Sequence, residues 1–166
     1  MDQQVHLEQI VLADVQPIFQ KAADKGKGEI FPTLWYATNI ELTAIQQAIM
    51  ARSILIAEDP HLKYAHLRLQ YSLFDSVNAN CSRNQHGSRS SWRKVENDVR
   101  LLMLDLIGSA LCHPASAPAL VNAAMGIQLY GDYFQDPYER MALKRVVERY
   151  RDAHAWPVKR LLEMFK

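Results

Sequence analysis

The side chains best suited to chemistry surround the start of one predicted helix. They are the cations Arg83, Arg89, Arg93 and Lys94 and the hydroxyls of Ser88, Ser90 and Ser91. A helix N-terminus adds unpaired N–H groups and about half a positive charge. Together these groups predict contact with a phosphate, a nucleic-acid backbone or an acidic peptide. The plainer interpretation is a solvated linker in which Ser91 caps the helix.

A second group of cations lies in the C-terminal part of the chain. Its members are Arg140, Lys144, Arg145, Arg149 and Arg151, with Lys159 and Arg160 beyond them. Helical spacing puts three of them on one face, which Glu148 interrupts. This pattern predicts either a nucleic-acid contact or an ordinary solvated helix face, and the formal net charge of the whole chain is only +1.

Four aromatic side chains gather where two predicted helices meet. They are Tyr130, Tyr133, Phe134 and Tyr138. Exposed aromatics at such a junction are typical of protein–protein hot spots. The alternative for each of them is burial in the core.

Metal binding and catalysis find little support in the sequence. The closest pairs are Cys81 with His86, Cys112 with His113, and Glu58 with His61. None has the ligand spacing of a closed zinc site, which needs four N or S ligands. The chain has no Gly-x-Ser-x-Gly elbow and no Gly-rich phosphate loop. We therefore expect no metal, no cofactor and no catalytic residues.

Composition indicates an ordinary globular protein. The chain has 166 residues, of which 49% are hydrophobic and 22% charged, enough for a single domain over 1–166 with a real core. Two cysteines cannot form a disulfide framework, which favours a reducing compartment. The N-terminus does not have the pattern of a signal peptide, and no run of about 18 apolar residues is found. These features predict a cytoplasmic protein that does not enter a membrane.

The elements that position these residues are predicted to be helices. Residues 91–112 are the most apolar stretch and carry only a narrow polar strip, which predicts a central helix buried on nearly all sides. Other helices are expected over 2–24 (interrupted at Pro17), 39–58, 60–77, 117–130, from 137 onward and after Pro157. Residues 78–90 are predicted to be a flexible polar loop. Residues 30–36 are either a short extended piece or the first turns of the next helix. The fold class is therefore all-α, a compact bundle of six to eight helices.

Two helix starts carry specific signals. Thr38 and Glu41 have the spacing of a capping box, in which each side chain satisfies the backbone N–H of the other. Asp136, Pro137 and Glu139 combine an N-cap, a proline in the first turn and a second capping-box acid.

These features favour a non-catalytic helical binding protein, such as an adaptor, regulator, inhibitor or complex subunit. We expect another protein as its partner, met through the 130–138 junction or through residues 78–94. A homodimer is compatible with the same features. The alternative is a nucleic-acid-associated subunit that contacts DNA or RNA phosphates through basic residues of 83–94 and 140–160.

Overall fold

Five α-helices and a two-stranded hairpin make up the part of the chain that the computed structural model describes. That part is residues 15–58, 82–154 and 157–165, with the backbone alone for 82–91. In chain order the elements are β1 (Phe19–Lys21), the 3-10 helix η1 (Lys25–Lys27), β2 (Thr33–Trp35), α2 (Asn39–Ala57), α4 (Ser82–Cys112), α5 (Ala117–Tyr130), the 3-10 helix η2 (Gly131–Tyr133), α6 (Pro137–His154) and α7 (Lys159–Glu163). The predominance of helix confirms the predicted class. The count does not reach the predicted six to eight, and the helix predicted over 60–77 lies outside the described residues.

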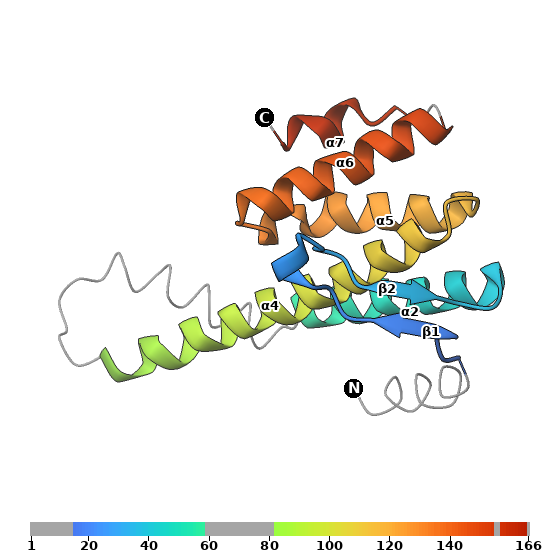
Figure 1. The fold of residues 1–166 in the computed structure, drawn as a ribbon. Helices are drawn as coiled ribbons and strands as arrows, with labels where there is room; N and C mark the ends of the chain where they lie inside the picture. Colours follow the sequence, from blue (N-terminus) through green and yellow to red (C-terminus); the bar gives the residue numbers. More distant parts are fainter. Residues whose placement is uncertain (1–14, 59–81, 155–156, 166) are drawn as a thin grey trace.

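The helices stack in layers, with α5 in the middle (Figure 1). On one side α5 packs against α2 and α4, which also pack against each other. On its other side it packs against α6, and α6 in turn carries α7. The middle helix is therefore α5, although the sequence predicts that role for residues 91–112.

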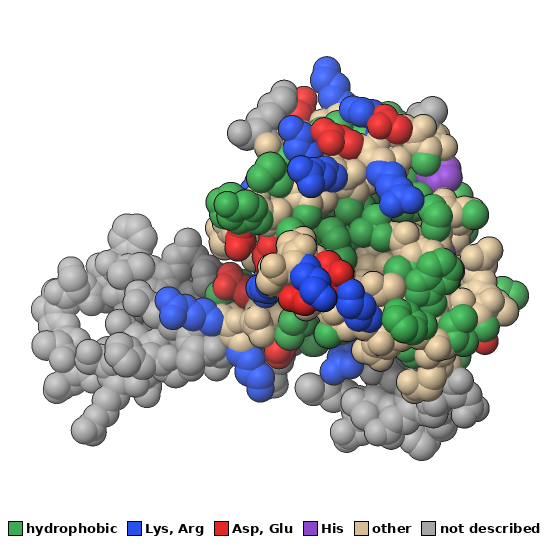
Figure 2. Space-filling view, in the orientation of Figure 1, with side chains coloured by type: hydrophobic (Ala, Val, Ile, Leu, Met, Phe, Trp, Pro, Cys, Tyr) green, Lys and Arg blue, Asp and Glu red, His purple; other side chains and the backbone are tan. Residues whose placement is uncertain are grey.

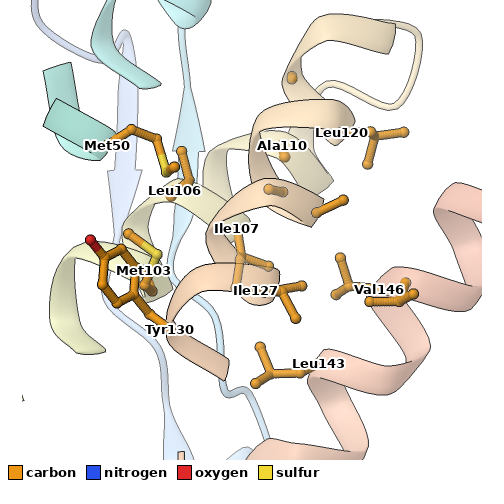
Figure 3. Close-up of a cluster of buried hydrophobic side chains, with 14 of the residues drawn as sticks. Met50, Met103, Leu106, Ile107, Ala110, Leu120, Ile127, Tyr130, Leu143 and Val146 are labelled. Carbon is orange, nitrogen blue, oxygen red and sulfur yellow. The ribbon is translucent and has the colours of Figure 1, made fainter. Parts of the chain in front are cut away.

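The core lies where α2, α4, α5 and α6 face one another. Figure 3 shows Met50 of α2, Met103 and Leu106 of α4, Ile127 of α5 and Leu143 of α6 converging there. All five are buried. Burying apolar surface stabilises a fold by about 25 cal/mol per Å². This burial is the main force that holds the layers together.

Among the described side chains of helix α4, burial is most continuous near its C-terminal end. Residues 106–110 are all buried, whereas Arg93, Lys94 and Leu101 are exposed. The helix begins at Ser82, so the predicted flexible loop over 78–90 is wrong for residues 82–90, and 78–81 lie outside the described residues. Each added residue of a helix gains a backbone hydrogen bond, so a well-packed helix can extend into a segment that has no apolar pattern of its own.

The hairpin corrects a second prediction. The helix predicted over 2–24 is wrong for residues 15–24, where β1 pairs antiparallel with β2, and residues 1–14 lie outside the described part of the chain. The peptide N–H of Ile18 donates to the carbonyl of Trp35 at 2.8 Å. Pro17 has no N–H for a helix, and branched and aromatic side chains suit a strand. For residues 30–36 the extended alternative is the correct one.

A close backbone contact seats the hairpin on α4. A Cβ added at Gly108 would lie 2.3 Å from the carbonyl oxygen of Pro32, so only glycine allows this approach. Within the connection between β1 and β2, Asp24 accepts a hydrogen bond from the N–H of Gly26. Gly28 in the same connection adopts a φ of 75°. Glycine tolerates this left-handed conformation, which ends η1.

Helix starts follow the predicted chemistry in one case and depart from it in another. The capping box of Thr38 and Glu41 is complete at the start of α2. Asp136 accepts a hydrogen bond from the N–H of Tyr138 at the start of α6. Glu139, predicted to complete a second capping box, is instead buried with a different partner, described below.

Polar side chains join three helices inside the core. The Gln46 amide of α2 donates to Ser109 Oγ of α4 at 3.0 Å and accepts from Asn122 Nδ2 of α5 at 3.1 Å. Gln47 donates to Asn122 Oδ1 at 3.1 Å. Buried amides without partners cost free energy, so this network selects one register of the three helices.

Candidate functional site

The outer face of the hairpin carries an aromatic pair open to solvent. Phe19 of β1 lies directly opposite Trp35 of β2, and their side chains are 53% and 44% exposed. Neighbouring Leu34 and Tyr36 point the other way and are buried. Figure 2 shows hydrophobic side chains gathered over this side of the molecule. We call Phe19 and Trp35, together with the exposed Ile18 that precedes Phe19, the hairpin surface.

His113, just beyond the end of α4, holds the hairpin surface in place. Its Nδ1 lies 2.9 Å from the carbonyl oxygen of Ser109, and its Nε2 accepts from the N–H of Tyr36 at 3.3 Å. Nε2 also lies 3.2 Å from the carbonyl oxygen of Tyr36, so the ring contacts both backbone polar groups of that residue. The ring also packs against Trp35, with centroids 5.3 Å apart. Trp35 is therefore supported from beneath while its outer side stays open.

Tyr36 and Asp105 are two titratable groups close enough to influence each other electrostatically. Burial raises the pKa of the Tyr36 hydroxyl, and the negative charge of Asp105 raises it further. The pKa of Asp105 is itself raised by partial burial, although part of its surface stays in water. In each case burial disfavours the charged form relative to the same group in water.

An ion pair joins the end of β1 to the connection that leads to β2. Lys21 donates to both carboxylate oxygens of Glu29, at 2.7 and 2.9 Å. The hydrogen bond from Lys21, followed by that from the N–H of Asp24, lowers the pKa of Glu29. Because the pair is exposed, it orients the loop more than it stabilises the fold.

The structure separates the four predicted interface aromatics. Tyr130 and Phe134 are buried and Tyr133 is half-buried, with the Tyr130 and Tyr133 rings 5.7 Å apart. Only Tyr138 is open, at 73% exposure. The 130–138 junction thus presents one aromatic side chain to solvent.

The predicted cations of the first group all lie on α4. Arg93 and Lys94 are exposed. Arg83 and Arg89 fall where the structure describes the backbone alone, and both positions are helical. Because α4 begins at Ser82, no helix start lies at Ser91, and the predicted contact of these cations with an anion or a partner stays a prediction.

The second group of cations divides into one internal and four exposed side chains. Arg140 donates to the carbonyl oxygens of Phe134 and Met164 and lies 5.5 Å from the ring centroid of Phe165. It therefore fastens the C-terminal segment to α6. The exposed members are Lys144, Arg145, Arg149 and Arg151.

Acidic side chains dilute this basic surface. Arg151 pairs with Asp152 at 2.8 Å, and hydrogen bonding to that carboxylate raises the pKa of the guanidinium. Figure 2 shows Lys and Arg mixed with Asp and Glu over α6 and α7. A mixed surface of this kind is typical of solvated helices.

A buried ion pair between α4 and α6 was not foreseen from the sequence. Both nitrogens Nε and Nη2 of Arg100 donate to the carboxylate of Glu139, and hydrogen bonding to Glu139 raises the pKa of Arg100. Lys25 lies 3.8 Å from the same carboxylate. The local pattern assigns Glu139 to a capping box, because the position of Arg100 in space is not visible in the sequence. The pair is structural.

Two hollows lie elsewhere on the described surface. A groove of about 420 Å³ between α5, α6 and α7 has apolar walls that include Met125, Tyr150 and Leu161, and no Ser, Cys, His, Asp or Glu lines it. A second hollow of about 330 Å³ lies between residues 25–30 and the start of α6. Its three carboxylates, those of Glu29, Asp136 and Glu139, already have the partners described above.

Helix α2 is, by length and composition, apolar enough to cross a membrane, with a mean hydropathy of 1.3 over the best window. Only 28% of that window is buried in the fold. Within the described residues, no group of three or more His, Cys, Asp or Glu is arranged to hold a metal ion.

No protein-family model matches the chain, and no curated protein or solved structure matches it. The site therefore rests on the geometry of this chain alone. Sequence reasoning missed the hairpin surface because Phe19 was assigned to a helix. The signal that could have indicated it is Pro17, which has no N–H for a helix and lies two residues before Phe19.

Proposed function

We propose that this chain is a non-catalytic binding protein that meets another protein through the hairpin surface. The observation that carries the proposal is the aromatic pair Phe19 and Trp35, directly opposed across the two strands and open to solvent. Aromatic anchors on a rigid support are the residues that contribute most to protein–protein affinity.

The support beneath the pair strengthens this reading. His113 is bonded to both α4 and the backbone of Tyr36, so Trp35 is ordered before a partner arrives. Pre-ordering lowers the entropy that binding must overcome. A partner offering apolar side chains and few charges fits this surface, since its three members carry no charge.

The test compares captured proteins among matched variants. Phe19→Ala and Trp35→Ala remove the aromatic pair, whereas Leu101→Ala and Met141→Ala change two other half-exposed apolar side chains, on α4 and α6. Quantitative mass spectrometry of affinity-purified material should show a protein partner that both hairpin variants lose by at least about tenfold, which corresponds to 1.4 kcal/mol each. The two control variants should retain it, and circular dichroism should show all four folded.

Two results contradict the proposal. One is the absence of any protein whose capture depends on Phe19 and Trp35. The other is capture of nucleic acid that falls steeply with salt and is lost on replacing Lys144, Arg145 and Arg149 by Ala. The second result would support the alternative prediction instead.

A further inference from the structure

Helix α2 is as apolar on its outer face as on its inner one. Its buried residues include two polar side chains, those of Gln46 and Ser53. Its outer face carries a stripe of five exposed residues, Ile40, Ala44, Gln47, Ala51 and Ile54. A helix at the surface of a protein normally shows charged and polar residues there. We call these five residues the outer stripe.

Among residues 15–58, 82–154 and 157–165, the neighbours of α2 leave the outer stripe exposed, with Gln47 bonded at its edge to Asn122 of α5. Helices α4 and α5 pack on the other side of α2, against Leu42, Gln46 and Met50. Figure 1 shows α2 in an outer layer, on the side away from α6 and α7. Ile40 is 83% exposed and Ile54 is 43% exposed.

The spacing of the outer stripe is that of a helix–helix seam. Its members follow one another at alternating intervals of four and three residues. This repeat of about 3.5 residues keeps a seam facing a second helix along its length. Alanines at two of the positions allow a close approach.

The order of residue types along the outer stripe is the same in both directions. From either end the stripe runs Ile, Ala, Gln, Ala, Ile, with Gln47 at its centre. Two copies placed antiparallel therefore bring Ile40 beside Ile54, Ala44 beside Ala51 and Gln47 beside its own counterpart. Such self-complementarity is what a two-fold interface requires.

Charges flanking the stripe favour the same arrangement. At about 100° per residue, Glu41 and Arg52 lie on one flank of the stripe. They lie at nearly equal distances along the helix on opposite sides of Gln47. In an antiparallel pair, Glu41 of each copy lies on the same side of the seam as Arg52 of the other. In a parallel two-fold pair the two flanks would lie on opposite sides of the seam, and these opposite charges would not meet.

We propose that a second copy of this chain covers the outer stripe, with α2 packed antiparallel against α2 about a two-fold axis near Gln47. The Gln47 amide donates one N–H to Asn122, which fixes its place at the axis. Its oxygen and second N–H are the groups that its counterpart can use. This interface is separate from the hairpin surface and does not depend on the function proposed there.

The size of the stripe sets the strength of the dimer. A helix of 19 residues is about 28 Å long at 1.5 Å per residue. One helix face is smaller than the roughly 800 Å² per partner of a standard interface. We therefore expect a reversible dimer with a dissociation constant on the order of micromolar or weaker.

Sedimentation velocity of the full chain over a range of concentrations tests the association. The wild type should shift from monomer to dimer, and Ala51→Glu should weaken dimerisation by at least about tenfold because it places a charge in the seam. Ala153→Glu is the matched control, an exposed alanine on α6, and should dimerise like the wild type. A wild type that stays monomeric at every concentration, or equal behaviour of the two variants, overturns the proposal.

Cysteine cross-linking tests the orientation. In a Cys81→Ser, Cys112→Ser background, Ile40→Cys and Ile54→Cys are prepared singly. A mixture of the two should form a disulfide-linked dimer, while each alone should not, because antiparallel packing separates like positions by about 21 Å. Cross-linking of each variant with itself would show parallel packing and contradict the proposal. Ala51→Glu should leave capture of a hairpin partner unchanged, so the two proposals fail independently.

Discussion

Single residues decide how the hairpin sits on the helices. Gly108 allows the backbone of Pro32 to approach α4, and His113 bonds the backbone of Tyr36 to the end of the same helix. Neither role depends on a neighbour in sequence. Asp105 lies in the same region and carries a charge in partly apolar surroundings.

We predict that Asp105→Asn changes the pH dependence of folding. Burial raises the pKa of Asp105 above its ordinary value of 3.8, so the folded state favours the protonated carboxyl. That stabilisation is fully present below the unfolded pKa and is lost as the pH rises through the folded pKa. Urea unfolding from about pH 3 to pH 7 should show the wild type losing stability relative to Asp105→Asn as the pH rises.

Asp132→Asn controls for the change in net charge, because Asp132 is exposed on η2. If Asp105→Asn and the wild type keep the same difference in unfolding free energy over the whole pH range, burial does not perturb Asp105.

At the scale of the elements, hydrogen bonds between polar side chains determine which faces of two helices pack together. Gln46 reaches α4 and α5 at once through Ser109 and Asn122. Arg100 and Glu139 join α4 to α6 in the same way. Apolar packing alone tolerates small slips between helices, whereas a buried amide without its partner costs about 1–3 kcal/mol.

The network therefore predicts unequal effects for two adjacent glutamines. Gln46→Ala leaves Asn122 Nδ2 without this partner and opens a cavity, which should reduce the free energy of unfolding by about 2–4 kcal/mol. Gln47→Ala removes a bond at the surface and should cost less than about 1 kcal/mol. Chemical denaturation at a low protein concentration, where dimerisation does not contribute, measures both. Equal losses would show that burial of Gln46 does not set its importance.

At the scale of the whole molecule, the hairpin depends on the helical stack. A two-stranded hairpin is marginal alone in water. Here Leu34 and Tyr36 are buried against the helices, so the strands gain their stability from packing.

We predict that the hairpin and the helices unfold together. In a Trp92→Phe, Trp156→Phe variant, the emission of Trp35 reports the hairpin and far-ultraviolet circular dichroism reports the helices. The two urea transitions should have the same midpoint, as expected for a two-state unit. A fluorescence transition at lower urea would show that the hairpin detaches first, which would weaken its role as a preordered surface.

Besides the apolar groove between α5, α6 and α7, exposed apolar side chains gather on the hairpin and on the outer stripe of α2. Contiguous apolar surface is typical of binding sites. A charged or polar exterior at Phe19, Trp35 and the outer stripe would have indicated a chain that works alone.

The sequence by itself determined the elements whose signals are local. The capping box of Thr38 and Glu41 and the apolar period placed α2, and the apolar period also placed α5 over 117–130. These features arise within one or two turns of a helix. For that reason they can be read without knowing what lies across the core.

Only the tertiary structure decided the features that depend on distant partners. It paired residues 19–21 with 33–35, turned Glu139 inward to Arg100, and buried Tyr130 and Phe134 while leaving Phe19 and Trp35 exposed. The outer stripe of α2 has an apolar period in the sequence, but which apolar face is covered depends on where α4 and α5 pack. Local spacing specifies that a face is apolar, and only packing specifies which face meets water.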